Sequence, residues 1–432
     1  MIAQSSSARS HEAIVLVTNA YPSDEDLYRY GFVHTRVKAY LKAGLKLDVY
    51  CVDLRRDSEA TYVFDGVTVV TGPPADFQSW VSVRGRATYL VHFPVKYMLE
   101  PLRQLRPEPR VIMWFHGYEI EAWHRRWFNF LDDDTTTAAS LIHLRQHSTE
   151  ALAYLRDFLK DRPLAQCVTV SDWFRHFVVE PDLGLMPRHF SVIPNFVDPG
   201  LFRFENKAPD HSRKVLVVRP FTSRKYATES VIQTIVEVVR RTGASEFQFS
   251  VFGEGPLFAE AEASLRGLPN VALHRRFLTR AEVAEQHRLH GIYLNPTVWD
   301  SHGVSTSEAM SSGLVPVTTD VCAVPEFVTD DVSGILAPPH DIDALAEGII
   351  ELGRDQARHR RLSRRAAEDT ARQCGWDATI ARELALIDGT GSTDTVTAPR
   401  SDVDWMARYR FLEAQFEAAL MEAKKSMAPD HP

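Results

Sequence analysis

The sequence predicts an α/β protein built from two doubly wound, Rossmann-like domains that face each other across a cleft. Three observations support this fold class. Short apolar runs of strand length alternate with segments of helical periodicity, which is typical of parallel sheets. The alternation is interrupted by the turn-rich segment 194–200 and then starts again. The chain has 432 residues, which is long enough for two domains of ordinary size.

The first half begins with a strand–helix–strand unit. Residues 13–18 form an apolar run of strand length, and residues 32–41 place apolar side chains at helical spacing. Gly44 stands where a glycine ends a helix, and the next strand is expected at 47–52. Further strands are expected at 67–70, 88–93, 110–115, 167–170 and 190–193, with a helix around 145–160. Strands joined through helices predict a parallel sheet.

The second half repeats the pattern. A strand at 214–218 is followed by a helix over about 226–242. Thr279 and Glu282 have the spacing of a capping box that opens another helix. Asp341 is expected to cap a helix with one apolar face. The remaining strands are expected at 247–252, 270–274, 292–295 and 314–318.

These elements predict an N-terminal domain over 13–200 and a C-terminal domain over 201–388. Residues 1–12 are polar and are expected to be disordered. Residues 389–432 are expected to hold a linker rich in Thr, Ser, Gly and Pro, followed by a helix over 403–425. Two interpretations of that helix are open: it packs on one of the domains, or it docks on a partner or a membrane surface.

The composition and the net charge of the chain argue against several classes of function. The net charge of -8 argues against general nucleic-acid binding. The four cysteines lie far apart and match neither a zinc-ligand spacing nor a disulfide framework, so a reducing cytoplasm is expected. The N-terminus lacks the apolar core of a signal peptide, and no apolar run reaches the ~20 residues needed to cross a bilayer. Any membrane contact is therefore expected to be peripheral, at the inner face.

The segment 299–339 carries the strongest indication of function. After a short apolar strand, Gly303 and small polar residues lead into a helix that stops at Gly313. The free backbone N–H groups and the dipole at such a helix start favour a phosphate. Two carboxylates, Asp300 and Glu308, flank this point and suit sugar hydroxyls. The segment therefore predicts a site for a nucleotide sugar.

This segment resembles the signature of the retaining GT-B glycosyltransferases, in particular glycosyltransferase family 4, the glycosyl transferases group 1. That signature has two glutamates separated by seven residues, then Ala-Met, a glycine and Pro-Val. The matching residues are Glu308-Ala309-Met310, Gly313 and Pro316-Val317, with Asp300 in place of the first glutamate. The resemblance implies a GT-B fold in which the N-terminal domain binds the acceptor and the C-terminal domain binds most of the nucleotide sugar.

The resemblance also implies roles for three candidate catalytic residues. Glu308 would accept hydrogen bonds from the ribose hydroxyls of the donor, and Asp300 would contact the donor sugar. His116, which precedes Gly117 at the end of a strand, would bind the donor sugar or polarise the site. His92 also ends a strand and competes with His116 for that role.

Other residues are expected to bind the donor. Two phosphates need cations, which Arg219 and either Arg224 or Lys225 would supply; the resemblance favours Lys225. Gly303 would allow the diphosphate to approach closely. The remaining expected donor-binding residues are Gly31, Phe277, Leu278, Val304, Ser305 and Thr306.

Three further segments carry weaker signals. Residues 253–256 resemble the Gly-x-Gly-Pro turn of the family. Residues 132–134, three aspartates, superficially resemble the metal-binding motif of another glycosyltransferase fold, but a solvated loop or helix cap is favoured because they follow no strand. Residues 122–131 interleave aromatic side chains with Arg125 and Arg126. They form either a membrane-facing segment that captures a lipid-linked acceptor or a packed core helix with two surface arginines.

The expected function is that of a retaining, metal-independent glycosyltransferase. It would move a sugar from a nucleoside diphosphate sugar to a saccharide or a lipid-linked saccharide, in a setting such as surface-polysaccharide biosynthesis. No cofactor besides the nucleotide sugar and no nucleic-acid partner are expected. The alternative is a nucleotide-sugar-binding protein without transfer activity that acts as a partner in a polysaccharide assembly complex.

Overall fold

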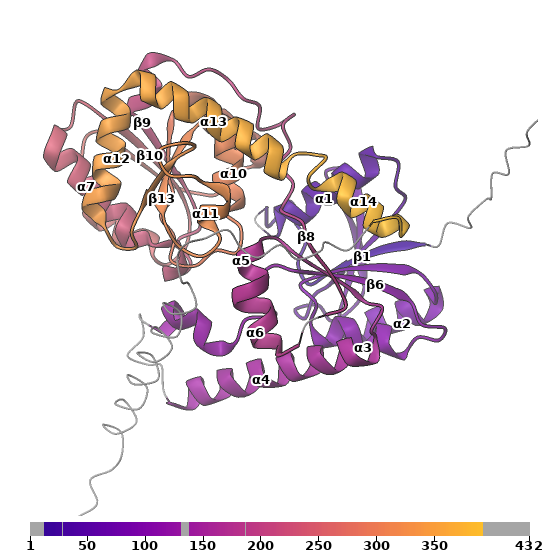
Figure 1. Ribbon diagram of the computed structural model, residues 1–432. Helices are drawn as coiled ribbons and strands as arrows, with labels where there is room; N and C mark the ends of the chain where they lie inside the picture. The colour runs from indigo at the N-terminus through magenta and orange to yellow at the C-terminus, as the bar shows by residue number, and fades with distance from the viewer. Residues whose placement is uncertain (1–12, 28, 131–137, 186, 392–432) are drawn as a thin grey trace, which may run out of the picture.

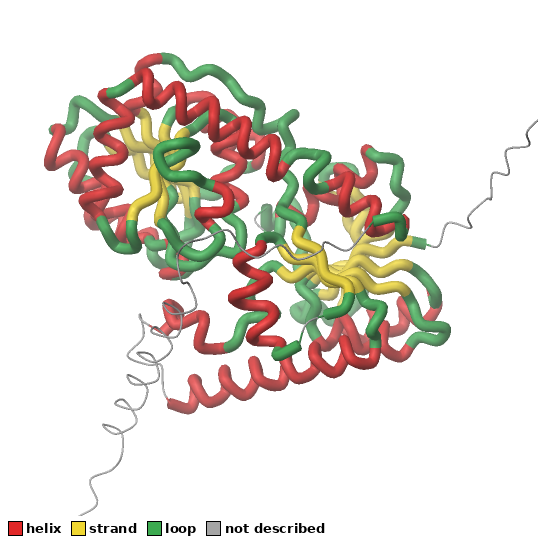
Figure 2. The backbone as a smooth tube through the Cα atoms, in the orientation of Figure 1, coloured by secondary structure: helices red, strands yellow, loops and turns green. Residues whose placement is uncertain are grey.

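The protein consists of two α/β lobes, each with its own sheet. The computed structural model describes residues 13–27, 29–130, 138–185 and 187–391. Within these ranges, helices surround an eight-stranded sheet in the first lobe and a six-stranded sheet in the second (Figure 1 and Figure 2). The predicted fold class, two Rossmann-like domains, is confirmed.

The sheet of the first lobe has the strand order β3-β4-β2-β1-β5-β6-β7-β8. Neighbouring strands are parallel, except that the edge strand β3 runs antiparallel to β4. The strands are β1 (Ile14–Thr18), β2 (Asp48–Val52), β3 (Ala60–Phe64), β4 (Val67–Gly72), β5 (Thr88–His92), β6 (Arg110–Phe115), β7 (Gln166–Thr169) and β8 (His189–Val192). A parallel sheet covered by helices explains the continuous apolar runs seen in the sequence.

The helices of the first lobe include the expected α1, which ends as predicted before Gly44, a glycine with a φ of +88°. The α-helices are α1 (Gly31–Lys42), α2 (Pro74–Arg84), α3 (Lys96–Gln104), α4 (Ala138–Asp161), α5 (Asp172–Phe174) and α6 (Glu180–Leu183). A 3₁₀ helix, η1 (Trp123–Phe130), and a π-helical turn, η2 (Arg175–Val179), complete the described set.

The sheet of the second lobe has the order β11-β10-β9-β12-β13-β14 and is parallel throughout its described strands. The strands are β9 (Lys214–Val218), β10 (Gln248–Gly253), β11 (Val271–Arg275), β12 (Ile292–Leu294), β13 (Val315–Thr319) and β14 (Ile335–Ala337). The helices are α7 (Thr228–Thr242), α8 (Phe258–Leu265), α9 (Arg280–Leu289), α10 (Val304–Ser311), α11 (Val324–Phe327), α12 (Ile342–Arg354) and α13 (Gln356–Cys374), with short 3₁₀ turns η3 (Pro209–Arg213) and η4 (Arg224–Tyr226).

Both predicted helix caps of the second lobe are confirmed. The Thr279 hydroxyl accepts from the backbone N–H of Glu282 at 3.2 Å, and the Glu282 carboxylate accepts from the backbone N–H of Thr279 at 2.8 Å. The Asp341 carboxylate accepts from the backbone N–H of Ala344 at 2.9 Å. These contacts satisfy N–H groups that a helix start leaves without partners.

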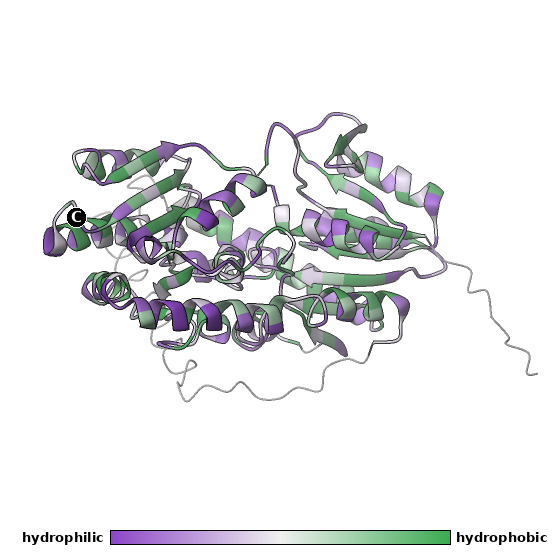
Figure 3. Cartoon of the chain, turned by 90° about the horizontal axis from the view of Figure 1, so that it is seen from above, coloured by the Kyte–Doolittle hydropathy of each residue, from purple (hydrophilic) through white to green (hydrophobic). Residues whose placement is uncertain are grey.

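Each predicted strand is present to within two residues at either end, and most of these strands lie in the core of their lobe. Val217, Val251 and Leu294 of the second lobe are fully buried. Figure 3 shows apolar strands inside and hydrophilic positions on the outer faces of the helices. The sequence analysis missed edge strand β3, in which half-buried residues alternate with exposed ones, and the three-residue edge strand β14. It also missed helix α13, whose composition is rich in arginine.

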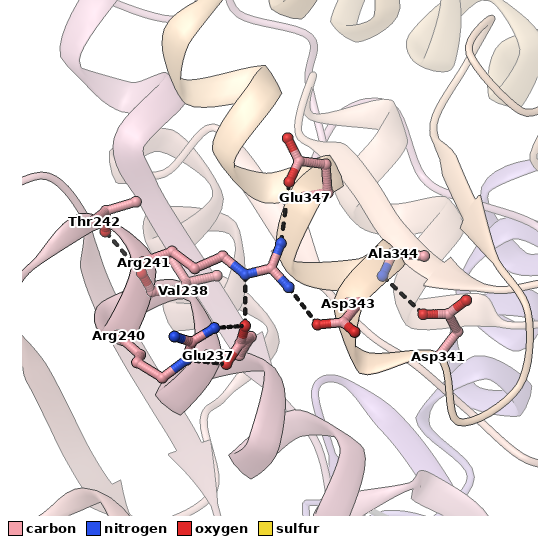
Figure 4. A network of polar contacts seen from close by, with 9 residues as sticks. All are labelled: Glu237, Val238, Arg240, Arg241, Thr242, Asp341, Asp343, Ala344 and Glu347. Carbon is pink, nitrogen blue, oxygen red and sulfur yellow. Dashed lines mark hydrogen bonds and ion pairs between the residues drawn. The ribbon is translucent and has the colours of Figure 1, made fainter.

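On the outer face of the second lobe, a charged network joins α7 to α12. Arg241 on α7 is ion-paired with Asp343 and with Glu347 on α12 (Figure 4). Glu237, on α7 as well, accepts from both Arg240 and Arg241. Such exposed pairs contribute little stability, so the two helices are held mainly by the apolar faces beneath them.

The last described helix, α14 (Ile380–Asp388), follows the second lobe in sequence but packs on α1 of the first lobe (Figure 1). Its Glu383, fully buried, accepts from Arg36 Nε at 2.9 Å and from the Tyr40 hydroxyl at 2.6 Å. The range expected for the C-terminal domain, 201–388, therefore includes a helix that belongs spatially to the first lobe. The domain division near residue 200 stays a prediction, and residues 1–12 and 403–425 lie outside the described residues.

We predict that Glu383→Ala destabilises the protein by about 3–5 kcal/mol, because it leaves the buried Arg36 guanidinium without its carboxylate. The free energy of unfolding is measured by urea denaturation. Glu347→Ala, which removes an exposed carboxylate, serves as the control and is expected to cost about 1 kcal/mol or less. Equal losses in the two variants would contradict the structural role assigned to α14.

Candidate active site

A cavity of about 490 Å³ lies between the two lobes. Its walls include residues that follow the carboxyl ends of β9 and β12, the end at which doubly wound sheets bind ligands. The first lobe contributes Pro22, Leu27, Gly31, Phe32, His34, Phe64 and Asp65. The second lobe contributes, among others, Arg219, Tyr226, Leu278, Thr279, Arg280, Asn295, Asp300, Val304, Ser305 and Glu308.

The cavity brings together many of the residues predicted from the sequence. Those on its wall are Gly31, Arg219, Leu278, Asp300, Val304, Ser305 and Glu308. Gly303 and Thr306 line a small adjoining pocket, which also touches Asp300. His116, Arg224, Lys225 and Phe277 do not line this cavity.

The start of helix α10 faces this cavity through Val304 and Ser305. Gly303 precedes the helix, and a Cβ atom there would lie 3.2 Å from the Thr306 hydroxyl. The position is therefore tight. Because the first N–H groups of a helix have no partner within the helix, this start can bind an anion, as the sequence predicted.

The two predicted carboxylates flank this helix start. Asp300 accepts a hydrogen bond from the backbone N–H of His302 at 3.1 Å, so it also shapes the loop before α10. Glu308 lies one turn into α10 and accepts from Arg280 Nη2 at 3.0 Å. Burial raises the pKa of Glu308, and the charge of Arg280 opposes that rise. Both carboxylates can accept hydrogen bonds from hydroxyl groups of a ligand.

Arg219 supplies a buried positive charge at the end of β9. It donates to the Asn295 side chain and to the Tyr226 carbonyl. Among the described residues, its buried Nε has no hydrogen-bond partner. Burial lowers the pKa of Arg219 to about 10, so the side chain is still charged at neutral pH. A buried guanidinium with an unused donor suits an anionic ligand.

The structure distinguishes the two neighbouring cations that the sequence analysis left open. Arg224 makes two contacts of 2.8 Å with the carboxylate of Glu260 on α8. Lys225 instead interacts electrostatically with Asp300. Burial lowers the pKa of Lys225, but Asp300 and other nearby groups raise it more, and the net result is a raised pKa. This arrangement favours Lys225 as the cation nearer the carboxylate loop.

His116 and His92, which competed for one role, form a buried pair. His116 Nε2 lies 3.0 Å from His92 Nδ1, and the rings are stacked. Burial lowers the pKa of His116 well below its usual value, so the imidazole is neutral. The backbone carbonyl of His116 accepts from the Ser301 hydroxyl at 2.6 Å, which joins the first lobe to the Asp300 loop.

The Gly-x-Gly-Pro segment has a steric role beside Arg219. Gly253 and Gly255 have φ angles of +153° and +144°. A Cβ at Gly253 would lie 1.9 Å from the Arg219 carbonyl oxygen, and one at Gly255 would lie 2.2 Å from the Phe221 carbonyl oxygen. Only glycine lets these two loops approach so closely. The segment therefore helps to position Arg219, although it does not itself line the cavity.

The polar residues of the cavity wall that the sequence analysis missed include Arg280, Asn295, His34 and Asp65. Asn295 directly follows β12, so its place after a buried strand was a usable signal. Arg280 stands inside the capping box that was recognised, but nothing in the local sequence shows that its side chain faces Glu308. His34 and Asp65 approach each other only in the folded first lobe, with 3.2 Å between His34 Nε2 and Asp65 Oδ2.

Residues 122–131 had two interpretations, a membrane-facing segment or a packed core helix with two surface arginines. The expectation of two surface arginines is wrong, because Arg125 is buried and pairs with Asp182, with Nη2 2.6 Å from Oδ1. The buried Phe128 beside it favours packing over a membrane-facing role. Residues 132–134 lie outside the described residues.

The described part of the chain holds neither a cluster of metal-binding side chains nor a membrane-spanning helix. No group of three or more His, Cys, Asp or Glu side chains has a metal-binding arrangement there. No helix within the same residues combines the length and the apolarity that a membrane span requires.

Parts of the chain are similar to known proteins. Residues 212–355 match the family described as Glycosyl transferases group 1. The chain is 28% identical over 149 residues to the D-inositol 3-phosphate glycosyltransferase of Kribbella flavida, which is 34% of each chain. It is 23% identical over 280 residues to the Amylovoran biosynthesis glycosyltransferase AmsK of Erwinia amylovora, which is 62% of each chain. The matches therefore span between about a third and about three fifths of these relatives.

A solved structure shares the fold along nearly its whole length. The sucrose-phosphate synthase of Thermosynechococcus elongatus superposes with a TM-score of 0.65 at 15% sequence identity, over 87% of this chain and 98% of that one. This likeness shows that the two lobes have the GT-B arrangement implied by the sequence resemblance.

We predict that Gly255→Ala distorts the loop that carries Arg219, because a Cβ at this position has no room beside the Phe221 carbonyl. The substitution is expected to lower the free energy of unfolding by about 1–3 kcal/mol. Urea denaturation measures the loss, and Gly267→Ala, where a Cβ would meet no atom within 4 Å, is the control. A Gly255→Ala variant as stable as the control would contradict the close approach.

Proposed function

Given that residues 212–355 form a glycosyl transferases group 1 domain, we propose that the chain is a glycosyltransferase that uses a nucleoside diphosphate sugar. One observation carries the proposal. The start of α10, the buried cation of Arg219 and the carboxylates of Asp300 and Glu308 meet at one cavity between two lobes. This combination offers donors for a diphosphate and acceptors for hydroxyl groups in a single place.

The second lobe would bind the donor. The N–H groups at the start of α10 and the side chains of Arg219 and Lys225 would hold the diphosphate. Glu308 would accept hydrogen bonds from the ribose hydroxyls, and Asp300 would accept from the sugar. Because these cations already balance the phosphates, the reaction would need no metal ion.

We further propose a retaining reaction. The bond between the anomeric carbon and the donor phosphate oxygen breaks, and the acceptor oxygen bonds to the same face of that carbon. The acceptor proton passes to the departing phosphate oxygen. Arg219 and Lys225 stabilise the charge that builds on the diphosphate. Neutral His116 would act through its contacts at the edge of the site and not as an obligatory base.

The first lobe would bind the acceptor. Its part of the cavity wall combines the apolar side chains of Leu27, Phe32 and Phe64 with the polar His34 and Asp65. This mixture suits a saccharide or a lipid-linked saccharide. The relative named for amylovoran biosynthesis supports a polysaccharide setting. The four cysteines are free and buried, which supports action in a reducing cytoplasm. No observation favours the alternative of a binding partner without transfer activity.

We predict that Glu308→Ala lowers the rate of sugar transfer by roughly tenfold to 25,000-fold, because one or two charge-assisted hydrogen bonds of about 1.5–3 kcal/mol each are lost. A thermal-shift panel of nucleoside diphosphates and their sugars first identifies the donor, since a ligand that binds the folded state raises the Tm. Transfer and donor hydrolysis are then measured with that donor.

The control for this experiment is Glu285→Ala, which removes an exposed carboxylate on α9. It is expected to leave transfer unchanged. Near-normal turnover by a folded Glu308→Ala variant would refute the role of Glu308. A panel in which no nucleotide raises the Tm would contradict the proposed function as a whole.

We predict that Lys225→Met weakens binding of the donor nucleoside diphosphate by about 10-fold to 100-fold, because a charge-assisted contact to phosphate is lost. Arg224→Met is the matched control on the adjacent residue. It is expected to weaken binding far less, since Arg224 is held by Glu260. Isothermal titration calorimetry measures both, and a larger loss for Arg224→Met would reverse the assignment.

A further inference from the structure

Arg280, the first residue of α9, reaches from the second lobe to the first. Its Nη2 donates to Glu308 Oε1 at 3.0 Å. Its Nη1 donates to the Thr35 hydroxyl on α1 and lies 3.4 Å from the Gly31 carbonyl oxygen. One guanidinium therefore joins the proposed ribose-binding carboxylate to the start of a helix in the opposite lobe.

The contacts of Thr35 are compatible with this link. The Thr35 hydroxyl donates its own hydrogen to the Gly31 carbonyl at 2.9 Å. Its lone pairs are then available to accept from Arg280, which is a donor only. The chain of hydrogen bonds thus has one consistent direction, from Arg280 through Thr35 to the backbone of α1.

The stability of α9 does not explain an arginine at this position. A positive side chain in the first turn opposes the helix dipole. The helix start is already satisfied by Thr279 and Glu282, which form the complete capping box. Arg280 is also partly buried at the cavity wall, where its guanidinium lies 5.3 Å from the centre of the Phe202 ring. These features indicate a role at the cavity.

We propose that Arg280 is a positioning residue for donor binding, which fixes the Glu308 carboxylate at the cavity wall and anchors it to α1 of the first lobe. The inference rests on the proposed function, because it takes Glu308 as the acceptor for the hydroxyl groups of a nucleotide. It adds that the first lobe takes part in donor binding through Thr35.

The charge of Arg280 also acts on Glu308. Burial raises the pKa of Glu308 and Arg280 lowers it, so removal of Arg280 raises the pKa further. A larger fraction of Glu308 is then protonated as the pH falls, and a protonated carboxyl accepts fewer hydrogen bonds. The other titratable groups on the cavity wall, which stay the same in all variants, are His34, Asp65, Arg219, Tyr226, His287, Tyr293 and Asp300.

The test uses calorimetric binding of UDP, GDP and ADP to the full chain between about pH 6 and about pH 8. For the nucleotide that binds the unmodified protein, Arg280→Met is expected to weaken binding by about tenfold, with a larger loss at the lower pH. The control is Arg276→Met, which removes an exposed arginine close by. The nucleotide itself titrates in this pH range, and the control is expected to show the same affinity and pH profile as the unmodified protein.

Two further variants separate positioning from general structure. In a Glu308→Gln background, Arg280→Met is expected to cause little additional loss and no additional pH dependence, because the carboxylate is absent. Thr35→Val keeps the Arg280–Glu308 pair but removes the hydroxyl on α1, and it is expected to weaken binding by several-fold. Circular dichroism and the Tm confirm that each variant is folded.

The outcomes distinguish this inference from the proposed function. If none of the three nucleotides, nor any other in the thermal-shift panel, binds the unmodified protein, the proposed function fails. If a nucleotide binds but Arg280→Met leaves its affinity and pH profile unchanged, the positioning role of Arg280 is overturned. An equal loss with and without the Glu308 carboxylate would also overturn it. Normal binding by Thr35→Val would overturn the anchor on the first lobe.

Discussion

A buried chain of polar contacts joins the two lobes to the loop that carries Asp300. Glu383 on α14 accepts from Arg36 on α1, and Arg36 Nη1 donates to the Asn195 side chain at 2.8 Å. The backbone N–H of Asn195 donates to His302 Nδ1 at 3.0 Å, and the backbone N–H of His302 donates to Asp300. These contacts tie the loop that carries Asp300 to the first lobe and to α14.

Burial makes this arrangement specific. The pKa of His302 is lowered to about 3 by burial, so its imidazole is neutral and Nδ1 can accept the hydrogen bond from Asn195. His116 is neutral for the same reason. The charged side chains on the cavity wall include Asp65, Arg219, Arg280, Asp300 and Glu308.

The two walls of the cavity differ in chemistry because they come from different lobes. The second lobe provides a helix start, cations and carboxylates, which together suit one anionic, hydroxyl-rich ligand. The first lobe provides mainly apolar side chains with the His34–Asp65 pair between them. Arg280 is the point at which the chemistry of the second lobe extends to the first, so the two walls do not act independently.

The sequence by itself determined all but two of the described strands, the two capped helix starts and the group of residues from Asp300 to Glu308, because apolar periodicity, capping and a local helix start depend on neighbours in the chain. Tertiary structure alone decided the rest. The return of α14 to the first lobe joins Glu383 to a residue 347 positions earlier, and the direction of Arg280 depends on α1. Polar contacts of this kind leave no periodic trace in the sequence, since their energy arises only when distant segments are buried together.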